Sequence, residues 1–134
     1  MATFMLIKKT LAGETLHVYD DGKVWCNFTC VDDIISGVRS CLFSPAGGDN
    51  GRVPYAIYNL ENSRGEEPMN VISIIEREWG GSVEINFIPI QYDNVTETCA
   101  NITDSTAEFG RKPIMNIADG LPKVIRWYRE FCTA

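Results

Sequence analysis

The stretch LHVYDDGKVWCNFTCVDDIISGVRSCL, residues 16–42, sets the fold class. Two runs rich in β-branched and aromatic residues, 16–19 and 24–31, flank the turn sequence Asp20-Asp21-Gly22-Lys23. Strand-like runs on both sides of an Asp/Gly turn predict a β-hairpin. The rest of the fold is built outward from this expected hairpin.

A helix is expected directly after the hairpin. Asp32 or Asp33 is a suitable N-cap, because its carboxylate can accept a hydrogen bond from the free backbone amides of the first turn. The helix ends before the glycine-rich loop at residues 45–51. Its predicted core face consists of Ile34, Ile35, Val38 and Leu42.

Helices and single strands alternate along the rest of the chain. Apolar residues recur at helical spacing between Leu121 and Cys132, which predicts the clearest helix of the chain. The other expected elements are a helix at 2–12 that stops at Gly13, a strand at 55–60, a helix opened by Pro68 and closed by Gly80 with the core face Met69, Ile72, Ile75 and Trp79, a strand at 83–90, and a helical turn that ends at Gly110. Four short strands with four to five helices predict one mixed α/β (α+β) domain over residues 1–134.

The composition excludes several classes of partner. The chain has 134 residues with 18 acidic and 12 basic side chains, a formal net charge of −6. Nucleic-acid and anionic-membrane binding need a concentrated basic face, so neither partner is expected. The sequence shows no signal-peptide pattern and no long apolar run. We therefore expect a cytoplasmic protein.

No familiar catalytic or metal-binding motif is present. The five cysteines are odd in number and widely spread, which favours free thiols. Cys26 and Cys30 have the spacing of half a zinc site, but His17 is the only histidine, so no metal is expected. Tyr19 and Lys23 match a Tyr-x-x-x-Lys pattern, yet the Asp-Asp-Gly between them predicts a turn where catalysis would need a helix.

A chain-long pattern resembles the carboxyl-terminal part of NAD-dependent nucleotide-sugar epimerases and dehydratases, most closely the UDP-glucuronate 4-epimerase group. The matching residues are Gly13-x4-Val18-Tyr19-x2-Gly22-x5-Phe28-Thr29-x2-Asp32-Asp33-Ile34, Tyr58-Asn59-Leu60, Glu67-Pro68-Met69, Pro89-Ile90-Gln91, Val95-x-Glu97-Thr98-x-Ala100, Gly110-x-Lys112-Pro113 and Asp119-Gly120-x6-Trp127-Tyr128-Arg129-x-Phe131.

The resemblance implies the fold and role of the substrate-binding portion of an extended short-chain dehydrogenase/reductase. The family's glycine-rich NAD loop and its catalytic tyrosine and lysine belong to a region upstream of the matched part. The resemblance therefore implies no catalytic residue and no bound cofactor in this chain. The substrate-binding positions that carry over are Phe28, Thr29, Asn59 and Gln91.

Several positions depart from the family pattern. Cys26 stands where the family usually has an arginine expected to pair with a substrate phosphate, and Asn27 replaces the following aspartate. The charge-assisted contact with the phosphate is lost there. Lys23, Arg39, Arg52 and Arg64 are alternative cations, although each is also explained as a surface charge.

Three hypotheses follow for function. The first is a non-catalytic domain that retains UDP-sugar binding. The second is an interaction protein, expected as a homodimer, that associates through apolar surface which the nucleotide-binding domain covers in the resembled enzymes. The third is one part of an NAD-dependent epimerase that a separate chain completes in trans.

Overall fold

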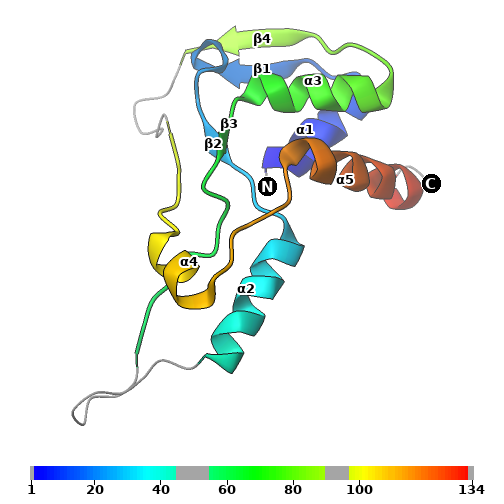
Figure 1. The fold of residues 1–134 in the computed structure, drawn as a ribbon. Helices are drawn as coiled ribbons and strands as arrows, with labels where there is room; N and C mark the ends of the chain where they lie inside the picture. The colour runs from blue at the N-terminus through cyan, green and yellow to red at the C-terminus, as the bar shows by residue number, and fades with distance from the viewer. Residues whose placement is uncertain (1, 45–54, 90–96, 133–134) are drawn as a thin grey trace. The chain divides into compact units, whose positions relative to one another are not determined.

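The computed structural model describes residues 2–44, 55–89 and 97–132 and contains five helices joined by short strands (Figure 1). The helices are α1 (Ala2–Leu11), α2 (Val31–Phe43), α3 (Pro68–Trp79), α4 (Thr103–Phe109) and α5 (Ile117–Cys132). The strands are β1 (Leu16–Tyr19), β2 (Cys26–Asn27), β3 (Gly65–Glu66) and β4 (Ile85–Ile88), and a short 3₁₀ turn, η1, covers Asp20–Gly22. The predicted mixed α/β class is confirmed.

The chain forms two compact units. Unit 1 consists of residues 1–26, 66–98 and 116–134, and unit 2 consists of residues 27–65 and 99–115. Unit 1 holds α1, β1, α3, β4 and α5, whereas unit 2 holds α2 and α4.

Unit 1 is built on a parallel strand pair. β1 lies beside β4, with Leu16 opposite Ile85 and Val18 opposite Phe87. Burial alternates along β1, so Leu16 and Val18 face inward and pack with Ile72 of α3. α3 contacts both α1 and α5. The buried apolar residues that join these elements are Ile7, Leu16, Val18, Val71, Ile72, Ile74, Ile75, Leu121, Ile125 and Tyr128.

The ends of α3 follow the local signals in the sequence. Pro68 occupies the first turn, where its missing amide would have no helical partner. At the other end Gly80 adopts a left-handed φ of 84°, and its amide bonds to the carbonyl of Glu76. The guanidinium of Arg129 in α5 donates to the carbonyls of Glu78 and Trp79, so a cation satisfies acceptors at the negative end of the α3 dipole.

The predicted hairpin is wrong. β1 pairs with β4 in parallel, and β2 pairs with β3. The turn sequence does turn: Asp20, Asp21 and Gly22 all have positive φ, and the amide of Lys23 donates to the carbonyl of Asp20, but the strands on either side do not pair with each other. Only Cys26 and Asn27 of the expected second strand are in a ladder. The partner of β1 is supplied by residues far along the chain, which a local turn signal cannot reveal.

Two further expectations are corrected. Residues 55–60 are not a strand, and the carbonyl of Asn59 accepts from the hydroxyl of Ser105 rather than from a neighbouring strand. The predicted core face of α2 is largely exposed at Ile35, Val38 and Leu42, and the buried residue of that helix is Gly37. The predicted face of α3 is right for Ile72 and Ile75, with Val71 and Ile74 added to it. The 45–51 loop expected to follow α2 lies outside the described residues.

Gly22 tests whether the η1 turn constrains unit 1. A Cβ added at Gly22, which has φ +80°, would lie 2.9 Å from Cγ of Met69. Gly13 has a comparable φ of +69° but open space around it. We expect Gly13→Ala to lower the free energy of unfolding by about 1 kcal/mol through the left-handed backbone. Gly22→Ala should lower it by about 1 kcal/mol more, because Met69 must move.

Urea denaturation of both variants measures this difference, with the linear slope checked for two-state behaviour. Equal losses in the two variants would show that the contact with Met69 contributes nothing.

Candidate functional site

The predicted substrate residues Phe28 and Thr29 lie in unit 2, just after β2, and both are half-buried. The hydroxyl oxygen of Thr29 accepts a hydrogen bond from the backbone amide of Asn62 at 2.9 Å. The side-chain amide of Asn27 donates to the carbonyl of the same Asn62. Residues 27–29 therefore bond to both backbone polar groups of Asn62, its amide and its carbonyl.

Asn59 anchors the same extended segment at a second point. Its side-chain amide donates to the carbonyl of Asn101 at 3.1 Å, and its own carbonyl accepts from the hydroxyl of buried Ser105 at 2.6 Å. The side chain of Asn101 in turn accepts from the amide of Thr103 at the start of α4. The resemblance predicts Asn59 as a substrate contact. In the structure, the hydrogen bonds of Asn59 link residues 55–65 to the segment that contains α4.

Thr29 and Asn59 are thus attached to one segment within unit 2, residues 55–65. No direct hydrogen bond between their side chains is recorded in the described structure. Gln91, the fourth predicted site residue, lies outside the described residues.

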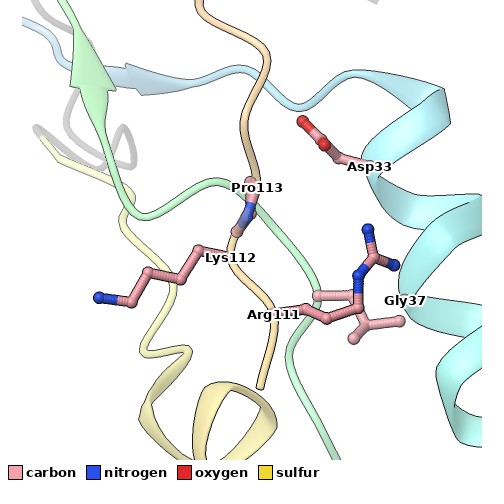
Figure 2. A pocket seen from close by; sticks show the side chains of 6 residues that line it. Asp33, Gly37, Arg111, Lys112 and Pro113 are labelled. Atoms are coloured by element: carbon pink, nitrogen blue, oxygen red, sulfur yellow. The ribbon is translucent and has the colours of Figure 1, made fainter. Parts of the chain in front are cut away.

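A small cavity opens in unit 2 beside α2 (Figure 2). Its volume is about 30 Å³, and it is lined by Asp33, Gly37, Leu60, Arg111, Lys112 and Pro113. That space holds about one water molecule. Pockets that enclose a drug-sized ligand have volumes of roughly 300 to 1,000 Å³. The cavity cannot enclose a nucleotide sugar.

Asp33, the acidic residue that lines this cavity, is hydrogen-bonded to the segment after α4. The two carboxylate oxygens of Asp33 accept from the backbone amides of Ile114 at 3.2 Å and Met115 at 3.0 Å. Figure 2 shows the guanidinium of Arg111 on the side of α2 and the ammonium of Lys112 extending away from it. Lys112 is part of a sequence motif. That motif does not predict that the Lys112 side chain lines a cavity.

The cations considered from sequence have other surroundings. Lys23 is exposed, and its ammonium lies 3.9 Å from the carboxylate of Asp21. The guanidinium of Arg39 lies 5.9 Å from the ring centre of Phe43. Arg64 belongs to unit 2, where its backbone amide donates to the side chain of Asn62. Arg52 is outside the described residues.

Tyr58 packs edge-on against Phe109, with ring centres 4.8 Å apart. Burial raises the pKa of its hydroxyl above the ordinary value of 10.0, and the acidic groups of Glu108, Cys41 and Asp104 act in the same direction. Tyr58 is therefore a neutral hydroxyl at physiological pH and not a base. Above pH 10 the folded chain keeps a proton that the unfolded chain releases, so stability falls as the pH rises there.

The described structure contains no cluster of three or more side chains suited to a metal ion. All five cysteines are free thiols, as the spacing predicts. None of the described helices is long and apolar enough to cross a membrane.

Comparison with known proteins identifies relatives along nearly the whole chain. Protein CapI of Staphylococcus aureus is 30% identical over 98% of this chain and 42% of its own length. UDP-glucuronate 4-epimerase 5 of Arabidopsis thaliana is 32% identical over 99% of this chain and 33% of its own length. This chain is a relative of the carboxyl-terminal part of NAD-dependent nucleotide-sugar epimerases and dehydratases. No family model matches it.

Solved structures agree on the fold of this epimerase-like chain. The UDP-glucuronic acid 4-epimerase of Bacillus cereus, described in complex with UDP-glucuronic acid and NAD, matches with a TM-score of 0.80 at 24% identity. The epimerase Mth375 of Methanothermobacter thermautotrophicus matches with a TM-score of 0.83 at 17% identity. The matches cover 97% and 99% of this chain but 40% and 38% of those chains. The epimerase-like chain thus spans about 40% of the proteins that share its fold.

Gly37 tests the close contact between α2 and Leu60. A Cβ at Gly37 would lie 2.8 Å from Cδ2 of Leu60. Gly37→Ala would stabilise a free helix by about 1 kcal/mol, but here we expect a net loss of roughly 1 kcal/mol from overpacking. In a Leu60→Ala background the clash is gone, so the same substitution should stabilise. Thermal or urea unfolding of the four chains measures the coupling, and the same effect in both backgrounds would contradict it.

Asp33 tests the link between α2 and residues 114–115. Asp33→Asn replaces one acceptor oxygen by a donor, so one of the two backbone amides loses its partner, with an expected loss of about 1–2 kcal/mol in the free energy of unfolding. Asp32→Asn removes the same charge from the same helical turn at an exposed position. Chemical denaturation should show an effect below about 0.5 kcal/mol for Asp32→Asn, and comparable effects of the two changes would leave only the helix dipole to explain them.

Proposed function

We propose that this chain is the substrate-side domain of a nucleotide-sugar epimerase, which contributes contacts to a UDP-sugar and does not catalyse by itself. The observation that carries the proposal is the match in sequence and fold along nearly the whole chain to relatives named UDP-glucuronate 4-epimerases. Residues 1–134 act as one such domain in this proposal.

The cavity beside α2 is separate from the proposed ligand contacts. A space of about 30 Å³ beside Asp33 and Arg111 cannot enclose a nucleotide sugar. Phe28, Thr29 and Asn59 do not line this space, so the proposed contacts with the ligand lie outside it, and further contacts would come from elsewhere. Since Cys26 replaces the cation expected to pair with phosphate in the resembled family, binding of a UDP-sugar to this chain alone should be weak.

The proposed ligand contacts are Phe28, Thr29, Asn59 and Gln91. Thr29 already accepts a bond from Asn62, which holds its side chain in one orientation. Its hydroxyl proton can be donated to a ligand oxygen. Asn59 is held by Asn101 in the same way. These bonds would pre-organise the polar groups before a ligand arrives, which lowers the entropic cost of binding.

An amide-resolved NMR titration with UDP, UDP-glucuronate and NAD tests this proposal. We expect saturable shifts near Phe28, Asn59 and Gln91 with both UDP ligands, a dissociation constant on the order of 1 mM, and no shifts with NAD. Thr29→Val should weaken binding several-fold, whereas Thr29→Ser keeps the hydroxyl and should not. Silence with both UDP ligands at concentrations well above 1 mM would overturn the proposal.

A second function, association with another protein surface, is favoured by α2. Its outer side exposes Val31, Ile35 and Leu42 by 66%, 61% and 75%. Contiguous exposed apolar surface marks interaction sites in proteins. The partner in this reading is either a second copy, giving a homodimer, or a nucleotide-binding chain that completes an epimerase in trans. Activity that arises only on mixing with such a chain would identify the latter.

A further inference from the structure

Asn59 is attached to the α4 region of unit 2 at two points. Its backbone carbonyl accepts a hydrogen bond from the hydroxyl of Ser105 at 2.6 Å, and its side-chain amide donates to the carbonyl of Asn101 at 3.1 Å. A single hydrogen bond leaves a residue free to turn about that bond. Two bonds, one to the main chain and one to the side chain, fix both the peptide plane and the direction of the Asn59 side chain.

The hydroxyl of Ser105 bonds to Asn59 in preference to its own helix. It also lies 3.1 Å from the carbonyl of Ile102, three residues earlier, which is a common acceptor for a serine inside a helix. A hydroxyl has one proton to donate, and the shorter of the two distances is the one to Asn59. Ser105 is only 6% exposed, so water competes little for that proton. The bond to Asn59 is therefore the main contact of this hydroxyl.

Both ends of α4 contribute to the attachment of this segment. At the start of the helix, the amide of Thr103 donates to the side chain of Asn101 at 3.0 Å, which fixes residue 101 relative to α4. At the end of the helix, Phe109 packs edge-on against Tyr58, the residue before Asn59. Residues 58 and 59 are thus held along the length of α4.

The side chain of Asn59 keeps two polar groups for a ligand. Asn59 is exposed, and one of its amide protons is used in the bond to Asn101. The groups left over are the side-chain oxygen, which accepts, and the second N–H, which donates. How well these groups are aimed at a ligand depends on the two bonds that fix Asn59.

We propose that Ser105 is a positioning residue of the UDP-sugar site: its buried hydroxyl holds the main chain of Asn59, so that the Asn59 side chain is oriented before a ligand arrives. This inference rests on the proposed UDP-sugar function and deepens it. Ser105 itself does not touch the ligand. A side chain that is already ordered loses less entropy on binding, so removal of the Ser105 hydroxyl should lower the affinity while the chain stays folded.

Ser105→Ala removes the hydroxyl and keeps the helix, because alanine favours a helix more than serine does. In NMR titrations with UDP-glucuronate, we expect this variant to bind roughly three- to fivefold more weakly than the wild-type chain. Thr106→Val is the matched control. It removes a buried hydroxyl from the neighbouring position of α4, and that hydroxyl has no hydrogen-bond partner in the part of the chain that the structure describes. Thr106→Val should therefore bind like the wild-type chain, and circular dichroism checks that both variants are folded.

A double-mutant cycle tests whether Ser105 acts through Asn59. Asn59→Ala removes the oriented side chain and should weaken binding by itself. In that background Ser105→Ala should have no further effect on the dissociation constant, because no Asn59 side chain remains to be oriented. Equal effects of Ser105→Ala in the two backgrounds would show that the hydroxyl acts elsewhere and would overturn the inference.

A measurement without ligand reports on the orientation alone. The NMR relaxation of the Asn59 side-chain amide nitrogen gives an order parameter for its fast motion. This order parameter should fall in Ser105→Ala and stay unchanged in Thr106→Val. An unchanged order parameter in Ser105→Ala would show that the hydroxyl does not orient Asn59.

The role of Ser105 and the proposed function fail by different results. Silence of the wild-type chain with both UDP ligands overturns UDP-sugar binding and, with it, the role of Ser105 in that site. Unchanged affinity in Ser105→Ala, or an equal loss of affinity in Thr106→Val, overturns the role of Ser105 while UDP-sugar binding stands.

Discussion

The parallel pairing of β1 with β4 is the constraint on which the rest of unit 1 depends. It joins residues 69 positions apart and buries Leu16 and Val18 against α3. Parallel strands need a crossover connection between them, and here that crossover contains α2, the 55–65 segment and α3. Once β1 and β4 are aligned, α3 covers them, and α1 and α5 pack on α3. The first segment of unit 2 is thus an insertion within the crossover of unit 1.

Elements with strong local signals could be predicted from sequence, whereas their partners could not. Glycine at the ends of α1, α3 and α4, proline at the start of α3 and the periodicity of α5 depend on neighbouring residues alone, and these helices form where expected. The hairpin failed because strand pairing is decided by tertiary contacts. For α2 the periodicity correctly predicted a helix with an apolar side. It could not say whether that side faces this chain or another surface.

The candidate site shows the same division. The resemblance predicts Thr29 and Asn59 as substrate contacts, and this stays a prediction; the structure shows each of them in a defined hydrogen-bonded position in unit 2. The place of Arg111 beside the cavity, by contrast, is known only from the structure. It depends on the segment after α4, whose backbone amides bond to the Asp33 carboxylate in α2. Such contacts depend on how distant segments of the chain pack together, so the spacing of residues in the sequence does not predict them. Thr29 and Asn59 are oriented polar groups in unit 2, and relatives more than twice as long share the fold of this chain.

The β1–β4 pairing also orders events during synthesis. β1 leaves the ribosome well before Ile85, and at roughly 5–20 residues per second this interval lasts several seconds. During that time Leu16 and Val18 lack their strand partner, and they also lack the cover of α3 until residues 68–79 have been made. For that interval the nascent chain carries an incompletely covered apolar strand, and a chaperone that binds short extended apolar segments would find its substrate there.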